Sequence, residues 1–252
     1  MLVAANRDEF LARPTGGPQL LDDPPRLVAG VDLVAGGTWL GVNQDGVVAA
    51  VLNRRTVNPP NPNRRSRGAL CAEALRLASI DEAKRRVLRW PPLEFNPCTL
   101  FLARVGGPAL VLMNEETGWK EVSLGPGLHV LTNRPLGDVE CPRRARAFAR
   151  FSSIVPQLAR GWSVELLGRL REMLADHAPQ ENDGVAGKEP ICVHLPGYGT
   201  RTATVIAVLA QPGFPPHANL WATTGPPCTT PFGEPLTLAL AARSLDSVRP
   251  AE

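Results

Sequence analysis

Short apolar runs bounded by glycine, proline and asparagine dominate the first third of the chain, and they predict β-strands. Leu2–Ala5 is one such run, and Thr38–Val42 and Val47–Leu52 are two more, separated by the sequence Asn-Gln-Asp-Gly. Asp-Gly between apolar runs is a strong hairpin signal, because these residues tolerate the backbone angles of a tight turn. We therefore expect antiparallel strands in this part of the chain.

The pattern changes to a helical one after a loop at 57–68 that is rich in proline and asparagine. We expect Ser66 to cap a helix over Arg67–Ala78. The sequence Ser-Ile-Asp-Glu at 79–82 is a capping box, and it predicts a second helix that ends near Trp90. Two helices in sequence are thus expected after the first strands.

More strands and one more helical region complete the pattern. The block Pro142–Ala178 is expected to be helical, with Ser163 as a cap and with Leu167, Leu170 and Leu174 on one helical face. Because the strands and helices come in runs and do not alternate, we expect an α+β layered domain. The further strand-like runs are Thr99–Val105, Ala109–Met113, Leu128–Leu131, Ile191–Leu195, Ala203–Leu209, Leu220–Thr223 and Leu236–Ala241.

Composition and charge narrow the function. The 252 residues suit one large domain or two small ones, and 44% apolar against 20% charged residues indicates a globular chain. The formal charge of +3 and an aromatic content of 5% give little reason to expect nucleic acid as a partner. No apolar run approaches the roughly 18–20 residues that span a bilayer, and no signal peptide is visible. We expect a cytoplasmic protein, or a mitochondrial or Golgi-associated one if it is eukaryotic, whose partner is a small molecule.

The thiols and imidazoles are scattered along the chain. Five cysteines contain no Cys-x-x-Cys pair, so we expect free thiols in a reducing compartment. Four histidines show no metal-ligand spacing, so we expect no metal site and no built-in cofactor. The residues concerned are Cys71, Cys98, Cys141, Cys192 and Cys228, and His129, His177, His194 and His217.

Four polar stretches follow or precede apolar runs, and they are the candidates for chemistry. They are Ala-Asn-Arg-Asp-Glu-Phe at 5–10, Asn-Arg-Arg at 53–55, Thr-Asn-Arg-Pro at 132–135 and Pro-Gly-Tyr-Gly-Thr-Arg-Thr at 196–202. An amide fixed at a strand end can stabilise an oxyanion, and Arg201 could bind a carboxylate through its planar fork. We expect these strand ends to meet at one edge.

Each stretch also has an ordinary structural interpretation. Asparagine after a strand is more often a turn residue than a catalyst. Tyr198, the only tyrosine, could be a packed aromatic residue. The arginines of the loop could be solvated, or they could form a cationic rim for an acidic ligand; they are Arg54, Arg55, Arg64, Arg65 and Arg67.

The order of these motifs is specific to one family. ANRDEF followed by RP, AGGTWLGV, AAVLN, SRG, VLTNRP and PGYGTRTATVI occur in this order from Ala4 to about Leu209. The chain thereby resembles the NRDE family, that of transport and Golgi organisation protein 2. The resemblance implies a single domain over 1–252, with 211–252 weakly matched.

The resemblance implies a fold and a set of site residues. The family resembles the N-terminal nucleophile hydrolases, whose four-layer αββα sandwich holds two antiparallel sheets between helical layers. In related acylases an N-terminal cysteine attacks an amide while its own α-amine acts as base. Carried over, Asn6 and Asp8 would orient the amine and thiol, Asn53 and Asn133 would serve the oxyanion, and Arg201 would support the thiolate.

The chain departs from the family pattern at its start. Members begin with Met-Cys and a first strand, whereas this chain begins inside the strand that carries Asn-Arg-Asp-Glu. The five cysteines are internal and have no α-amine. We expect an assigned start too far downstream, or a fragment, rather than true loss of the nucleophile.

Two functions are therefore expected, and the enzymatic status stays open between them. The first is handling or trafficking of a small haem-like or lipid-like ligand on a hydrolase-like fold, with Arg7, Trp39, Arg54 and Tyr198 contacting the ligand. For haem itself the chain offers no Cys-Pro motif, and His194 is the only histidine near the polar stretches. The second is an N-terminal cysteine amidohydrolase acting on a small acyl amide, provided that a cysteine lies upstream.

Overall fold

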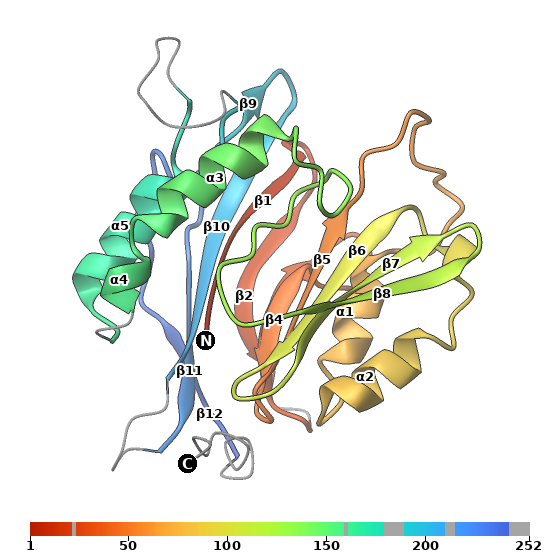
Figure 1. The fold of residues 1–252 in the computed structure, drawn as a ribbon, viewed down its shortest axis with the longest axis horizontal. Coiled ribbons are helices and arrows are strands. Elements are labelled where there is room, and N and C mark those ends of the chain that lie inside the picture. Colours follow the sequence, from red (N-terminus) through yellow and green to blue (C-terminus); the bar gives the residue numbers. More distant parts are fainter. Residues whose placement is uncertain (22–23, 159–160, 179–188, 210–214, 242–252) are drawn as a thin grey trace.

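The protein is a four-layer sandwich in which two antiparallel sheets lie between two layers of helices (Figure 1). The computed structural model describes residues 1–21, 24–158, 161–178, 189–209 and 215–241. This arrangement confirms the predicted α+β class and the αββα layering. Among the described residues, no helix combines the length and the apolar character that crossing a membrane requires.

The first sheet is built from both ends of the chain. The N-terminal strand β1 pairs antiparallel with the long strand β10, which also pairs with β11 and with the short β9. β1 has a strand partner on one side only in the part of the chain that the structure describes. The strands are β1 (Leu2–Phe10), β9 (His194–Leu195), β10 (Tyr198–Leu209), β11 (His217–Ala222) and β12 (Leu236–Ala239).

The second sheet is a meander in which each strand pairs with the next one along the chain. Because strands that are neighbours in the sequence pair with each other, the hairpin signals of the sequence could predict part of the strand pairing in this sheet. The strands are β2 (Thr15–Leu21), β3 (Leu27–Asp32), β4 (Leu40–Asn43), β5 (Val47–Asn53), β6 (Cys98–Arg104), β7 (Ala109–Glu115) and β8 (Gly118–Leu124).

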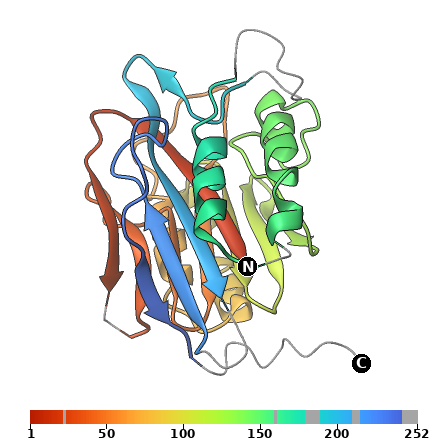
Figure 2. The same ribbon diagram turned by 90° about the vertical axis from the view of Figure 1, so that its left-hand side faces the viewer.

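Helices cover the outer face of each sheet (Figures 1 and 2). In the part of the chain that the structure describes, two α-helices and a short 3-10 helix lie against the second sheet, and three α-helices lie against the first. The helices of the second sheet are α1 (Gly68–Ala74), α2 (Ile80–Val87) and the 3-10 helix Pro92–Glu94; those of the first are α3 (Pro142–Ser152), α4 (Val155–Leu158) and α5 (Val164–Leu174).

The alternation of side chains along the strands produces three apolar cores. In β1, Val3 and Ala5 pack between the two sheets, whereas Leu2 and Ala4 pack under the helices of the first sheet. A third core joins the second sheet to α1 and α2. Since side chains alternate across a strand, each sheet can bury both of its faces.

Two of the three predicted helix caps are confirmed. The Oγ atoms of Ser79 and Ser163 accept hydrogen bonds from the third residue of α2 and α5, both at 3.2 Å. The prediction for Ser66 was wrong, because α1 begins one residue later with Arg67 at the N-cap and no side-chain cap. The backbones of Gly37 and Gly68 approach each other closely, and this contact constrains where α1 begins.

Other sequence predictions need correction. Leu128–Leu131 is not a strand, and β2, β3 and β8 were not predicted. The predicted strand Leu2–Ala5 extends to Phe10 and includes the polar stretch Asn6–Glu9. Likewise the predicted strand Ala203–Leu209 begins earlier, at Tyr198, and includes most of the polar stretch 196–202. The two stretches pair with each other, so each provides the backbone partners of the other, although neither sequence alone indicates a strand.

Candidate functional site at the polar end

The ends of four strands meet at one end of the sandwich. Phe10 at the end of β1 pairs with Tyr198 at the start of β10, and Asn53 at the end of β5 pairs with Cys98 at the start of β6. In Figure 1 this is the upper end of the molecule. We call it the polar end and define it by Arg7, Asp8, Glu9, Arg13, Asp32, Arg54, Arg67, Arg143, Tyr198, Thr200 and Arg201.

Arg7 faces the interior between the sheets. Its guanidinium lies 4.3 Å from the centroid of the Trp39 ring, and its Nη1 donates a 2.7 Å hydrogen bond to Oγ1 of Thr15. The side chain is 8% exposed, and this burial lowers the pKa of Arg7. The Arg7 guanidinium and the Trp39 ring therefore form the boundary between the polar end and the core between the sheets.

Asn6 points the other way, toward the helices of the first sheet. Its Nδ2 donates hydrogen bonds to the backbone oxygens of Leu174 (2.8 Å) and Ile191 (3.0 Å). The Oδ1 atom of Asn6 is buried and has no hydrogen-bond donor among the described residues. Asn6 therefore ties β1 to the end of α5 and leaves one acceptor open.

Asp8 lies on the same face of β1 as Asn6. Its Oδ1 accepts a 2.6 Å hydrogen bond from Oγ1 of Thr200, and its Oδ2 lies 3.6 Å from Nη1 of Arg143 on α3. Burial raises the pKa of Asp8, and the Thr200 hydrogen bond and the Arg143 charge offset only part of that effect.

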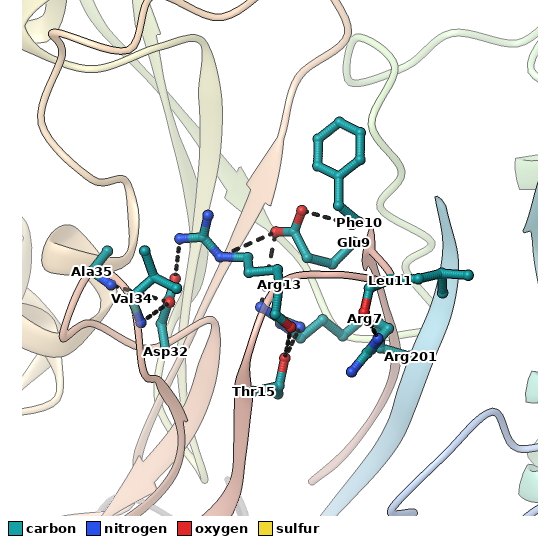
Figure 3. A network of polar contacts seen from close by, with 10 residues as sticks. All are labelled: Arg7, Glu9, Phe10, Leu11, Arg13, Thr15, Asp32, Val34, Ala35 and Arg201. Carbon is teal, nitrogen blue, oxygen red and sulfur yellow. Dashed lines mark hydrogen bonds and ion pairs between the residues drawn. The ribbon is translucent and has the colours of Figure 1, made fainter. Parts of the chain in front are cut away.

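A β-bulge lies between Arg7, which faces the space between the sheets, and Asp8, which faces the helices. Arg7 pairs with Thr202 and Asp8 with Thr200, so that Arg201 is an extra residue in β10. The guanidinium of Arg201 donates a hydrogen bond to the backbone oxygen of Leu11 (Figure 3). Arg201 thus closes the turn after β1 and lies close enough to Arg7 for their charges to interact.

A carboxylate and guanidinium network spans from the first sheet to the second (Figure 3). Oε2 of Glu9 lies 3.9 Å from Arg7 and 3.8 Å from Arg13, and Arg13 donates a 2.7 Å hydrogen bond to Oδ2 of Asp32. Oδ1 of Asp32 accepts from the backbone amides of residues 34 and 35. The network fixes the chain between β1 and β2 against the end of β3.

Arg67 adds a further cation beside this network. Its charge interacts with Cys98, Glu9 and Arg13, and burial lowers the pKa of Arg67. Among the described residues, its guanidinium has no hydrogen-bond or ion-pair partner. Burial also raises the pKa of Cys98 to about 12, despite the nearby Arg67 and Arg54. Because burial disfavours the thiolate, Cys98 is a poor candidate for a nucleophile.

Several arginine donors at the polar end lack an acceptor. The Nε atoms of Arg13, Arg54 and Arg143 are buried and have no hydrogen-bond partner in the described part of the chain. The other end of the Arg54 guanidinium donates to the backbone oxygen of Asn114. Because buried polar groups are usually paired, these donors indicate a place for acceptor atoms from outside the chain.

The two remaining predicted oxyanion residues lie on the surface nearby. Asn53 and Asn133 are exposed, and the backbone oxygen of Asn133 accepts a 2.6 Å hydrogen bond from the amide of Arg55. Beside them is an open groove of about 550 Å³, which Arg55, Thr56, Val57, Arg134 and Pro135 line. The structure thus places Asn6, Asp8 and Arg201 on paired strands, and the Arg55–Asn133 hydrogen bond brings the segment after β5 against the segment 132–135.

Tyr198 covers the outer corner of the polar end. Its ring packs edge-on against Phe10, with ring centroids 5.5 Å apart. Tyr198 is half-buried, and burial, then the charges of Asp8 and Glu9, raise its pKa. The ring borders the network but is not part of a closed core.

Sequence reasoning missed several residues that the fold gathers. Asp32 and Arg143 complete the network but carry no motif signal of their own, and Arg13 and Thr200 lie within the quoted motifs but were not singled out as site residues. It also missed a cluster outside the polar end, in which His177, Cys192, His194 and Cys228 lie together. The sequence Cys-Val-His at 192–194 was the one local signal for this cluster.

Comparison with known proteins identifies relatives over most of the chain. The family model described as Transport and Golgi organisation 2 matches residues 1–213. The chain is 30% identical over 237 residues to the Transport and Golgi organization protein 2 homolog of Bos taurus, covering 84% of this chain and 83% of that protein. It is 27% identical over 236 residues to the homolog of Homo sapiens, with the same coverage.

Solved structures share the fold at much lower sequence identity. Penicillin V acylase from Agrobacterium tumefaciens matches with a TM-score of 0.52 at 16% identity, over 89% of this chain and 80% of that one. Conjugated bile acid hydrolase from Clostridium perfringens gives 0.51 at 10% identity, over 88% and 85%. The N-acylethanolamine-hydrolyzing acid amidase ortholog of Caenorhabditis elegans gives 0.52 at 14% identity, over 81% and 91%. These likenesses establish the N-terminal nucleophile hydrolase fold.

Proposed function

The chain belongs to the Transport and Golgi organisation 2 family, and we propose that it binds a small amphipathic molecule that carries a carboxylate. Haem and fatty acids are two ligands of this chemistry. The polar end would bind the carboxylate, and the apolar residues beside it would contact the rest of the ligand. The proposal concerns ligand binding and handling, and it needs no nucleophile.

The observation that carries the proposal is the unpaired guanidinium of Arg67. This half-buried cation has no acceptor among the described residues, and its neighbours Arg13 and Arg54 each keep a buried Nε without a hydrogen-bond partner there. A guanidinium is complementary to a carboxylate, which can accept two parallel hydrogen bonds from it. One bound carboxylate would therefore satisfy donors that the chain itself leaves open.

Apolar surface lies within reach of these cations. Trp39 lies against Arg7 and is packed, with Phe101, at the edge of the core between the sheets. An amphipathic ligand needs such a neighbourhood, in which a few polar groups fix orientation and apolar side chains supply area. The arrangement supports a lipid-like or porphyrin-like acid more than a small polar anion.

The test compares matched ligands and matched arginine variants. Isothermal titration of the protein with laurate and with lauryl alcohol isolates the carboxylate, and quenching of tryptophan fluorescence by haem tests the larger ligand. Arg67→Gln removes the unpaired cation. Arg76→Gln, an exposed arginine beyond the other end of α1, is the control.

We expect laurate to bind, lauryl alcohol to bind at least about tenfold more weakly, and Arg67→Gln to remove that preference, as loss of one charged hydrogen bond predicts. Arg76→Gln should behave as the wild type. Equal affinity for acid and alcohol, or an unchanged preference in Arg67→Gln, would reject the proposal.

A second candidate function is amide hydrolysis, which one observation favours. β1 has a strand partner on one side only among the described residues, and a strand added on the other side would lie beside Asn6 and Asp8. The three similar structures named above are an acylase, a hydrolase and an amidase. A strand that starts with cysteine would bring an α-amine and a thiol to this edge.

N-terminal sequencing and intact mass of the protein expressed from its native gene test this second function first. A processed cysteine upstream of Leu2 would support it, and a chain that begins at Met1 would exclude it. If the cysteine is present, release of amine from an N-acyl amide should be abolished by Asn133→Ala, with little change in thermal unfolding, and retained in the exposed control Asn58→Ala.

A further inference from the structure

Four side chains of the kinds that bind transition metals lie together on the helix-covered side of the first sheet. They are His177, Cys192, His194 and Cys228, and their ligand atoms all lie within 4.8 Å of one another. They come from three separate segments: the chain after α5, the segment that enters β9, and the loop between β11 and β12. We propose that they form a tetrahedral zinc site of the Cys2His2 type.

The separations of the atoms fit this geometry. The two Sγ atoms of Cys192 and Cys228 are 3.8 Å apart, and Nε2 of His194 lies 3.5 Å from the first and 3.4 Å from the second. Zinc bonds of about 2.3 Å to sulfur and about 2.0–2.1 Å to nitrogen imply tetrahedral edges of about 3.8 Å between sulfurs and about 3.5 Å between sulfur and nitrogen. Three ligands thus already form one face of the tetrahedron.

His177 supplies the fourth ligand. Its ring lies edge-on to that of His194, with ring centroids 5.1 Å apart, and it is exposed, so that its ring can rotate toward the metal without displacing core residues. Closing a distance of at most 4.8 Å to that of a tetrahedral edge requires a movement of about 1 Å. Four protein ligands leave no open position, which is the arrangement of a structural zinc site.

The backbone around the ligands is fixed in advance. The carbonyl oxygen of Asp176, next to His177, accepts hydrogen bonds from the amides of Ile191 and Cys192, both at 2.9 Å. On the other side, Nε of Arg171 in α5 donates to the backbone oxygens of Pro227 (3.0 Å) and Thr230 (3.2 Å). Hydrogen bonds therefore already hold together the three segments that carry the ligands before a metal binds.

The ligand set selects the metal. Two thiolates and two imidazoles in a tetrahedral arrangement suit zinc, whereas calcium and magnesium prefer oxygen ligands. On binding, the two thiols become thiolates and release two protons, so zinc keeps its charge and no oxidant or reductant is needed. The competing chemistry is a disulfide between Cys192 and Cys228, which would require the sulfurs to approach to about 2.05 Å and would consume an oxidant.

The site would stabilise the fold beside the polar end. His194 is close enough for its charge to interact with Asp8, and Thr200, the partner of Asp8, accepts at Oγ1 a 2.9 Å hydrogen bond from the amide of Val193. A metal that fixes 192–194 therefore also fixes the Thr200 hydroxyl. This places the zinc site next to the Asp8–Thr200 pair of the polar end, and metal binding there can be measured in the absence of any other ligand.

The experiment measures metal stoichiometry and coordination in the full chain. Protein purified under reducing conditions is loaded with zinc, dialysed, and analysed by inductively coupled plasma mass spectrometry. Cobalt(II) then replaces zinc, and its absorption spectrum reports thiolate ligation and tetrahedral geometry. The variants are His177→Ala and Cys228→Ser, with the exposed His129→Ala as the matched control.

We expect one zinc per chain, a tetrahedral cobalt spectrum with thiolate charge-transfer bands, and retention of both in His129→Ala. His177→Ala should weaken zinc binding at least about tenfold and should change the cobalt spectrum while the protein stays folded. Sub-stoichiometric zinc after loading, a cobalt spectrum without thiolate bands, or unchanged affinity in both variants would overturn the proposal. So would a Cys192–Cys228 disulfide that forms in place of metal binding in protein kept under reducing conditions.

Discussion

The guanidinium of Arg7 lies over the Trp39 ring, 4.3 Å from its centroid, at the end of the core between the two sheets. Arg7 comes from the first sheet, and Trp39 immediately precedes β4 of the second. Their contact therefore bridges the two sheets at the point where the apolar core gives way to the polar end.

Arg7→Gln should destabilise the protein. The change removes the cation over Trp39, the hydrogen bond to Thr15 and the charge beside Glu9. Together these losses predict a decrease of about 1–3 kcal/mol in the free energy of unfolding. Urea denaturation measures it, with Arg76→Gln as the exposed control. Equal stability of Arg7→Gln and the wild type would show that the contact contributes nothing.

Asn43→Ala should cost more than an ordinary surface change. The buried Asn43 donates to the backbone oxygens of Leu75 and Leu77 and accepts from the amides of Asp45 and Val47, all at 2.8–3.0 Å. Removing it leaves four backbone groups without their partner, which predicts a loss of about 3 kcal/mol or more. Thermal and urea unfolding check this value, and the exposed Asn58→Ala should change it little. A small loss in Asn43→Ala would mean that water replaces the amide.

Acid should weaken the fold in part through Asp32. Burial alone would raise the pKa of Asp32, but the hydrogen bonds from Arg13, Val34 and Ala35 outweigh it and lower that pKa below its ordinary value. A carboxylate with a lowered pKa stabilises the folded state above its unfolded-state pKa, and this stabilisation is lost as the pH falls through its folded-state pKa.

The measurement is the free energy of unfolding of wild type and Asp32→Asn between neutral and acidic pH. The difference between the two should be largest near neutral pH and should shrink as the pH falls below the ordinary aspartate range. A difference that stays constant over this range would contradict the assigned ionisation.

Gly37→Ala should disrupt the start of α1. A Cβ atom at Gly37 would lie 2.6 Å from the backbone carbon of Gly68 and 2.8 Å from its oxygen, which no side-chain rotation can relieve. We expect a loss of about 1–3 kcal/mol, as for other overpacked sites. Gly17→Ala is the matched control, because a Cβ there meets no atom within 4 Å. Comparable melting temperatures for both variants would contradict the close approach of the two backbones.

The sequence predicted the parts of the fold that depend on neighbouring residues. The Asp-Gly turn between β4 and β5 places Gly46 at a φ of 76°, a left-handed conformation that favours glycine, and the capping box at Ser79 starts α2. The extension of β1 over Asn6–Glu9 and of β10 over Tyr198–Thr202 was not predicted, because the partner of each stretch lies at the other end of the chain. Tertiary pairing overrides the local preference of polar residues for turns there.

The same distinction applies to the candidate site. Strand ends with polar residues could be recognised one by one, and their meeting at one end of the sandwich followed from the layered fold. The partners Arg13 with Asp32 and Asp8 with Arg143 could not, because each pair joins segments whose approach only the folded chain determines. No local pattern encodes a contact between β1 and α3.

The bulge at Arg201 has a consequence for insertions and deletions in β10. Because of this one extra residue, Thr200 and Thr202 point to opposite faces of the first sheet. Thr202 pairs with Arg7 and faces the space between the sheets, whereas Thr200 pairs with Asp8 and faces the helices. If residue 201 were instead accommodated without a bulge, it would lie opposite Asp8 and Thr200 would move to the opposite face, whereas removal of residue 201 would restore regular alternation and keep Thr200 opposite Asp8. The spacing of this strand, as much as its composition, therefore decides which of its hydroxyls reaches Asp8.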